Sequence, residues 1–105
     1  MKDLLSIADL TPKEFWNLIN KAEKIKRNPK AYSKKLYEKT LLTMFEAPSL
    51  RTRISFEVAM TQLHGETLNF QAEHSPWGIG KETIEDVART ISQYCDILAA
   101  RIYSH

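Results

Sequence analysis

The sequence has a single cysteine, Cys95, so no disulfide can form within the chain. Glycine and proline are also scarce, at three and four residues in 105, and no low-complexity tract or repeat is present. No apolar run is long enough to cross a bilayer, and the N-terminus, charged from Lys2 onward, lacks the apolar core of a signal peptide. These absences predict a cytoplasmic protein, and the length suits one small domain.

The chain also lacks an excess of charge of either sign. Fifteen basic and thirteen acidic residues give a formal net charge of +2 at pH 7. Such a balance gives no electrostatic reason to expect nucleic acid or a membrane surface as a partner. Much of the basic excess lies between residues 21 and 39, which we interpret as a solvated helix end and the loop after it.

Helical and strand-like patterns alternate along the rest of the sequence. The run Thr11-Pro12-Lys13-Glu14 predicts a helix start with an N-cap, a proline at the first position and a capping-box glutamate. Asn28-Pro29 predicts its end, and Gly65 the end of a second helix. The expected elements are helices at 12–28, from about 52 to 63 and from about 83, a loop at 31–39, and strands at 40–45, 66–71 and 97–103.

This order predicts the α/β class, with an N-terminal helix followed by β-α-β-α-β and a parallel sheet with right-handed crossovers. Ligands of such sheets lie beyond the carboxyl ends of the strands. Residues 49–53 follow the first strand, a loop from Ala72 follows the second, and Arg101 lies late in the third. We therefore expect these three regions to meet at one edge of the sheet.

Two arginines, Arg51 and Arg53, stand where the first strand gives way to a helix, flanked by Ser49 and Thr52. Cations at a helix N-terminus oppose the macrodipole, so the pattern favours an anion that supplies the missing negative charge. A phosphate fits best, because its oxygens suit guanidinium groups, hydroxyls and helix N–H groups. The alternative interpretation makes Ser49 an ordinary N-cap and the arginines solvated surface charge.

Four segments carry a family resemblance: residues 48–57, 63–65, 82–92 and 96–103. The first reads Pro-Ser-Leu-Arg-Thr-Arg-Ile-Ser-Phe-Glu and resembles the Ser-Thr-Arg-Thr-Arg motif with which aspartate and ornithine carbamoyltransferases bind carbamoyl phosphate. The others resemble, in the same order, the end of that family's following helix, its third helix and its third strand. The resemblance covers essentially the whole chain, and the Glu-Thr-Ile-x-Asp-x-Ala-Arg run at 82–89 is nearest to the ornithine branch.

The resemblance implies roles for individual residues. Arg51, Thr52 and Arg101 would be catalytic: Arg51 and Thr52 would bind the phosphate, and Thr52 and Arg101 would reach the carbamoyl carbonyl. Carbamoyl phosphate would bind to Ser49, Leu50, Arg51, Thr52, Arg53 and Arg101, with Leu50 standing where the family motif has threonine. Trp77 and Lys81 belong to a loop that, in this family, reaches a neighbouring subunit's active site. No cofactor and no metal are expected.

The resemblance also implies the reaction, which is transfer of a carbamoyl group to the amino group of ornithine, giving citrulline and phosphate in arginine biosynthesis. Aspartate, acylornithine or putrescine is an alternative acceptor, and a non-catalytic phosphate-binding or folding fragment is an alternative of another class. Residues 1–105 correspond to the N-terminal portion of a carbamoyl-phosphate-binding domain, without the acceptor-binding domain. We therefore expect the chain alone to be inactive and the full-length form to be a homo-oligomer based on trimers.

Overall fold

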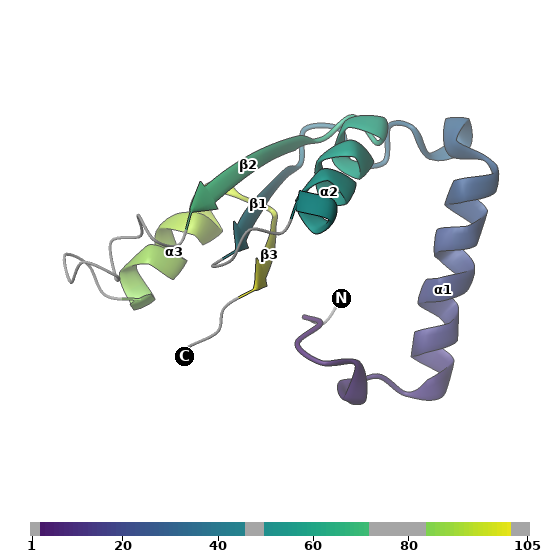
Figure 1. Ribbon diagram of the computed structural model, residues 1–105, viewed down its shortest axis with the longest axis horizontal. Helices are drawn as coiled ribbons and strands as arrows, with labels where there is room; N and C mark the ends of the chain where they lie inside the picture. The colour runs from purple at the N-terminus through teal and green to yellow at the C-terminus, as the bar shows by residue number, and fades with distance from the viewer. Residues whose placement is uncertain (1–2, 46–49, 72–83, 102–105) are drawn as a thin grey trace. The chain divides into compact units, whose positions relative to one another are not determined.

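The computed structural model describes residues 3–45, 50–71 and 84–101. The chain divides into two compact units, Met1–Tyr32 and Ser33–His105. The first unit holds the N-terminal helix, and the second holds the sheet with two further helices (Figure 1). None of the helices in the described ranges is long and apolar enough to cross a membrane.

The first unit contains a short 3₁₀ helix, η1 (Ile7–Asp9), the helix α1 (Pro12–Arg27) and a second 3₁₀ turn, η2 (Pro29–Tyr32). The predicted capping box is confirmed: Thr11 Oγ1 accepts from the Glu14 N–H at 3.1 Å, and Glu14 Oε1 accepts from the Thr11 N–H at 2.9 Å. The helix ends at Arg27, as the Asn28-Pro29 pair predicts. The expectation of a plain loop from residue 31 is wrong at its start, because η2 continues to Tyr32, whose ring lies 5.5 Å from the Lys21 ammonium.

The sheet of the second unit has three parallel strands in the order β2-β1-β3. Their bounds are β1 (Thr40–Phe45), β2 (Glu66–Gln71) and β3 (Ile97–Arg101). The predicted bounds of β1 and β2 are confirmed, and β3 begins where predicted. Residues 102 and 103, the predicted end of the third strand, lie outside the described residues.

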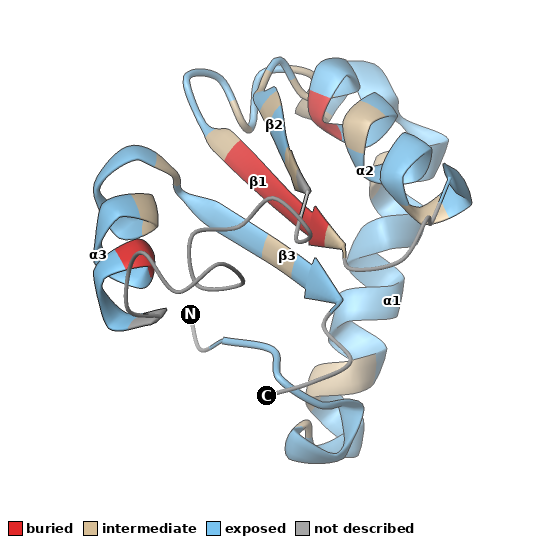
Figure 2. Cartoon of the chain, turned by 60° about the vertical axis from the view of Figure 1, so that its left-hand side comes forward, coloured by how far each residue is buried: buried red, intermediate tan, exposed pale blue. Residues whose placement is uncertain are grey.

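The core of this unit lies along β1, the central strand (Figure 2). Its residues Leu41, Leu42, Thr43 and Met44 are all buried, which explains why this strand reads as a continuous apolar run. The one polar member, Thr43, is 0% exposed, and its hydroxyl donates to Asn69 Oδ1 of β2 at 3.0 Å. The buried hydroxyl is therefore satisfied by the neighbouring strand.

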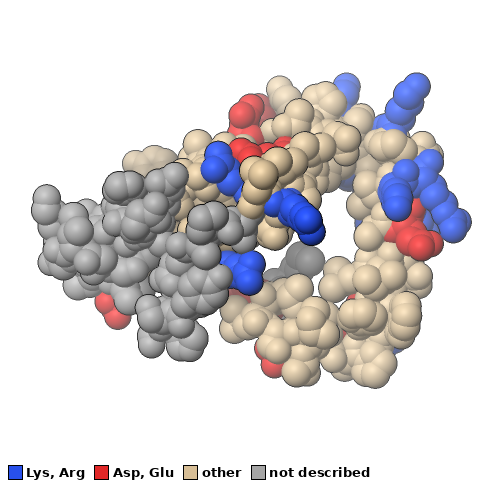
Figure 3. Space-filling model, in the orientation of Figure 1, with Lys and Arg blue, Asp and Glu red and all other residues tan. Residues whose placement is uncertain are grey.

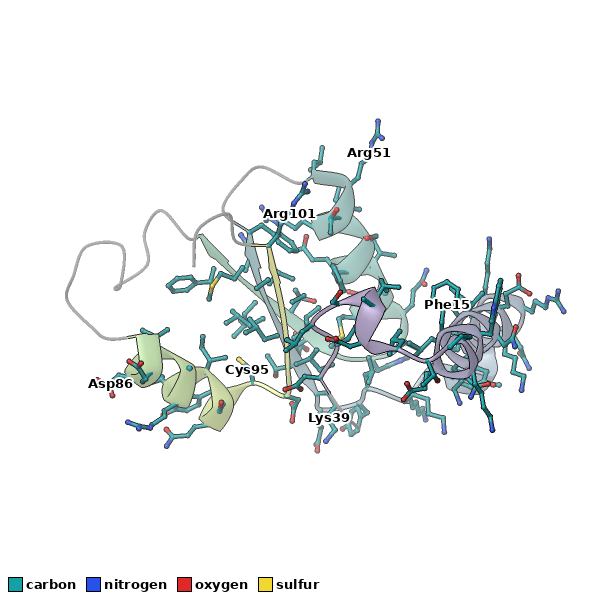
Figure 4. All side chains as sticks on the ribbon, turned by 90° about the horizontal axis from the view of Figure 1, so that it is seen from below. Phe15, Lys39, Arg51, Asp86, Cys95 and Arg101 are labelled. Atoms are coloured by element: carbon teal, nitrogen blue, oxygen red, sulfur yellow. The ribbon has the colours of Figure 1, made fainter. Side chains whose placement is uncertain are left out.

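Two helices connect the strands: α2 (Leu50–Gln62) joins β1 to β2, and α3 (Ile84–Tyr94) joins β2 to β3. They lie on opposite faces of the sheet (Figure 4). This arrangement follows from right-handed crossovers, because the chain steps from β1 to one side and then back past β1 to the other. The chain adds β2 on one side of β1 and β3 on the other, so the switch point of the sheet lies between β1 and β3.

The end of α2 differs from the prediction in its mechanism. His64, not Gly65, takes the left-handed conformation that stops the helix, with φ 64°. The Gly65 N–H donates to the Met60 carbonyl at 2.7 Å and the His64 N–H to that of Thr61 at 3.1 Å, which is the Schellman pattern. Gly65 is needed for space instead, because a Cβ there would meet the Met60 side chain and lie 3.2 Å from the Leu36 and Lys39 carbonyl oxygens.

Candidate functional site

The carboxyl ends of the three strands are in register. Phe45, the last residue of β1, is paired with Gln71 of β2 on one side and with Arg101 of β3 on the other. Arg101 therefore stands at the carboxyl edge, at the boundary where the strand order reverses. In doubly wound sheets this switch point is where ligands bind.

The helix α2 is placed over the same edge by aromatic contact. Phe56 of α2 lies 6.4 Å from Phe45 between ring centroids, and Met60, one turn further on, is buried. These two anchors fix the face that α2 turns toward the sheet, so its first turn lies near the end of β1. Arg101 is paired with Phe45 at the carboxyl end of β1, and the first turn of α2 follows on from that same end (Figure 4). The loop from Ala72, the third region predicted to meet at this edge, lies outside the described residues.

The arginine side chains at this edge do not point toward one another (Figure 4). Arg51 is exposed and extends outward from the first turn of α2, away from Arg101 (Figure 4). Basic side chains lie over both the start of α2 and the end of β3 (Figure 3). An anion shared by Arg51 and Arg101 would require the Arg51 side chain to turn back toward the sheet, which its long, exposed stem permits.

The remaining described residues of the motif have distinct surroundings. Thr52 is half-buried, and its carbonyl accepts from the Ser55 hydroxyl at 2.8 Å. Arg53 Nε lies 3.4 Å from Glu57 Oε2, one turn further along the helix. Leu50, the first residue of α2, is 71% exposed. The second helix thus begins two residues before the predicted start at 52, within the motif itself.

Several predicted site residues lie outside the described residues. These are Ser49, Trp77 and Lys81, together with most of the loop that follows β2. In the part of the chain that the structure describes, no three His, Cys, Asp or Glu side chains gather into a group that could hold a metal ion.

A feature that the sequence interpretation missed is a shallow depression of about 570 Å³ along α2. Its apolar part is a stripe of exposed residues at helical spacing, Leu50, Ile54 and Val58. The spacing i, i+4, i+8 was the available signal. The stripe lies on the side of α2 away from Phe56 and Met60, so it meets the candidate anion site only at Leu50 and Arg51.

The topology defines a parallel α/β unit of the doubly wound class, with its switch point between β1 and β3. Residues 2–105 match the family model described as "Aspartate/ornithine carbamoyltransferase, carbamoyl-P binding domain". The chain belongs to this family, as its motifs predict.

Individual relatives come from both branches of the family. The ornithine carbamoyltransferase of Vibrio sp. (strain 2693) is 37% identical over 105 residues, covering 100% of this chain and 35% of its own length. The aspartate carbamoyltransferase catalytic subunit of Lachnoclostridium phytofermentans is 44% identical over 101 residues, 96% of this chain and 33% of its own.

Solved structures give the same picture. The ornithine carbamoyltransferase of Pyrococcus furiosus superposes with a TM-score of 0.88 at 42% identity, over 99% of this chain and 34% of that one. The aspartate transcarbamoylase catalytic subunit of M. jannaschii gives 0.84 at 37% identity, over 100% and 35%. The chain therefore spans about a third of the length of the relatives that it matches.

Proposed function

We propose that this chain provides part of the carbamoyl-phosphate site of a carbamoyltransferase. The observation that carries the proposal is the register of Arg101 with the end of β1, at the edge where the arginine-bearing first turn of α2 also lies. Ser49, Leu50, Arg51, Thr52 and Arg53 supply the helix start, and Arg101 supplies a second cation from the sheet.

The chemistry of carbamoyl transfer suits such a site. The acceptor's neutral amine nitrogen forms a bond to the carbonyl carbon, and the bond from that carbon to the phosphate oxygen breaks. Phosphate leaves with the electron pair and takes up the proton that the nitrogen loses. Negative charge grows on the carbonyl oxygen and on the leaving phosphate. Arg51, Thr52 and Arg101 would stabilise that charge with guanidinium groups, a hydroxyl and backbone N–H groups fixed in advance.

The acceptor that we propose is ornithine, which would make the product citrulline and place the enzyme in arginine biosynthesis. The Glu-Thr-Ile-x-Asp-x-Ala-Arg run favours this branch. Aspartate is the second candidate, because a relative described as an aspartate carbamoyltransferase catalytic subunit is 44% identical. Leu50, an apolar residue where the motif has a hydroxyl, leaves acylornithine and putrescine as further alternatives.

The proposed assembly is a cytoplasmic homo-oligomer based on trimers. In it, Trp77 and Lys81 would belong to the loop that completes a neighbouring subunit's site. This part of the proposal rests on the place of Trp77 and Lys81 in a loop that reaches a neighbouring subunit in the family; both residues lie outside the described residues.

The test is calorimetric titration of carbamoyl phosphate into the protein and into an Arg101→Gln variant, followed by an acceptor assay. We expect binding by the protein and at least about tenfold weaker binding by the variant, because a charge-assisted contact is lost. Enzyme that contains the chain should form citrulline with ornithine and much less carbamoyl-aspartate with aspartate. Equal binding by both proteins would contradict the site, and binding without turnover would favour the non-catalytic alternative.

A further inference from the structure

The two arginines at the start of α2 differ in their partners. Arg53 Nε lies 3.4 Å from Glu57 Oε2, and the two side chains are 45% and 38% exposed. Arg51 is exposed, and within the described ranges no carboxylate is paired with it. One guanidinium of the motif is therefore already neutralised by the chain, and the other is available to a ligand.

Helix stability does not explain the Arg53–Glu57 pair. A cation near the N-terminus with an anion one turn later is the order that the macrodipole disfavours. Two other helical ion pairs of the described residues, Glu23–Arg27 and Asp86–Arg89, place the acid first. The reversed order of Arg53 and Glu57 thus needs another reason, and both residues stand at or beside the motif.

The charge requirement of the ligand supplies that reason. The phosphate group of carbamoyl phosphate carries close to two negative charges, and the proposed ligands Arg51 and Arg101 would balance them together with the positive end of α2. A third cation on the phosphate would also hold the released phosphate more tightly. Tighter binding of the product slows its release.

We propose that Glu57 is a positioning residue of the carbamoyl-phosphate site. Its carboxylate holds the Arg53 guanidinium along the side of α2, so that Arg51 is the first-turn arginine that contacts the phosphate. This inference rests on the proposed function and adds to it a division of labour between the two arginines. It also adds Glu57, a residue that the motif interpretation did not include.

The test uses inorganic phosphate as the probe, titrated at about 0.15 M ionic strength so that distant charges are screened. We expect Arg51→Gln to weaken binding by about tenfold or more, and Arg53→Gln to change it by less than about twofold. Glu57→Gln should strengthen binding by about threefold, because Arg53 is released, and the gain should vanish in the Arg53→Gln/Glu57→Gln double variant.

Two controls separate positioning from simple helix support. Glu57→Asp keeps the charge and should keep the wild-type affinity. Glu23→Gln breaks the comparable i, i+4 pair on α1 and should leave phosphate binding unchanged. The NMR signal of the Arg53 Nε–H should shift in Glu57→Gln without any phosphate present, which reports that the pair is broken. If the pair only supported the helix, phosphate binding in that variant would be weaker and not stronger.

The outcomes distinguish the inference from the function on which it rests. Phosphate binding by the wild type with an unchanged affinity in Glu57→Gln overturns the inference alone. Equal losses in Arg53→Gln and Arg51→Gln do the same, since Arg53 would then be a ligand in spite of Glu57. A wild type that binds no phosphate overturns the proposed function, and the inference with it.

Discussion

The helices α1 and α2 begin in opposite ways. The first turn of α1 holds Pro12, Lys13 and Glu14, and Thr11 and Glu14 satisfy each other's backbone N–H groups. The first turn of α2 holds Leu50, Arg51 and Thr52 and contains no acidic residue. One helix start is thus completed by its own side chains, and the other carries added positive charge at its positive end.

The difference separates a helix start that serves stability from one suited to an anion. The third helix, α3, follows α1 in this respect, with Glu85 and Asp86 in its first turn. An acidic residue in the first turn stabilises a helix by about 0.3–1 kcal/mol. The first turn of α2 has none and carries Arg51 instead. A ligand that brings negative charge would recover that free energy on binding.

The largest expected effect comes from giving α2 the kind of start that α1 has. Thr52→Glu puts a carboxylate at the third helical position, where α1 has Glu14. We expect phosphate binding to fall by about 100-fold or more, because a fixed carboxylate repels the anion and competes for the same N–H groups. Unfolding free energy should rise by about 0.3–1 kcal/mol.

Calorimetry with phosphate and urea unfolding of the same samples measure the two changes. Thr52→Gln, which has similar size without charge, is the control and should give a much smaller loss of binding. A Thr52→Glu variant that still binds phosphate like the wild type would show that the start of α2 is not the anion site.

The next largest effect concerns the second helical position, which is Lys13 in α1 and Arg51 in α2. Arg51→Gln should weaken carbamoyl-phosphate binding by about 1.5–3 kcal/mol, the usual loss for a charge-assisted hydrogen bond. Lys13→Gln removes a cation from the matched position and should change nothing beyond error. Similar losses in the two variants would mean that general charge, and not the site, attracts the ligand.

Much of the fold could be predicted from local sequence because the decisive signals are local. The capping box at Thr11 predicts a helix start and the apolar run at 40–45 predicts a buried strand, and both predictions are confirmed. The sequence predicts the start of α2 two residues late, because Leu50 and Arg51 carry no capping signal of their own. The sequence predicts Gly65 as the residue that ends α2, because a histidine with positive φ is uncommon. The reason for a glycine at position 65 is tight packing against Met60 and two carbonyl oxygens, which only the structure shows.

The candidate site was predictable in part for the same reason. Parallel strands bring their carboxyl ends to one edge, so the position of Arg101 beside the end of β1 was predictable from the order of the elements. The outward direction of Arg51 depends on its rotamer, which no periodicity encodes. The i, i+4 spacing of Arg53 and Glu57 allows their pairing, but only the structure shows that the pair forms. The roles of Ser49, Trp77 and Lys81 stay predictions, since these residues lie outside the described ranges.

A smaller effect tests the α1 side of the comparison. Thr11→Ala removes the hydroxyl that accepts from the Glu14 N–H, and should cost about 1 kcal/mol of helix stability. Hydrogen exchange of the amides in the first turn of α1 should quicken accordingly, while phosphate affinity stays unchanged. Thr11→Ser, which keeps the hydroxyl, is the matched control. A change in phosphate affinity in Thr11→Ala alone would mean that the two helix starts are not functionally separate.

The smallest expected effect lies at the other end of α2, where His64 holds a φ of 64° that glycine adopts at no steric cost. His64→Gly relieves that strain, of about 1 kcal/mol. It also removes the hydrogen bond from His64 Nδ1 to the Ser33 carbonyl and makes the unfolded chain more flexible. We expect the gain from relieved strain and the two losses nearly to cancel, leaving the unfolding free energy within about 0.5 kcal/mol of the wild type.

His64→Ala is the control, since it loses the hydrogen bond and keeps the strain. It should be less stable than His64→Gly by about 1 kcal/mol. Urea unfolding measures both variants, and an alanine variant as stable as the glycine variant would show that the left-handed residue costs the helix end nothing.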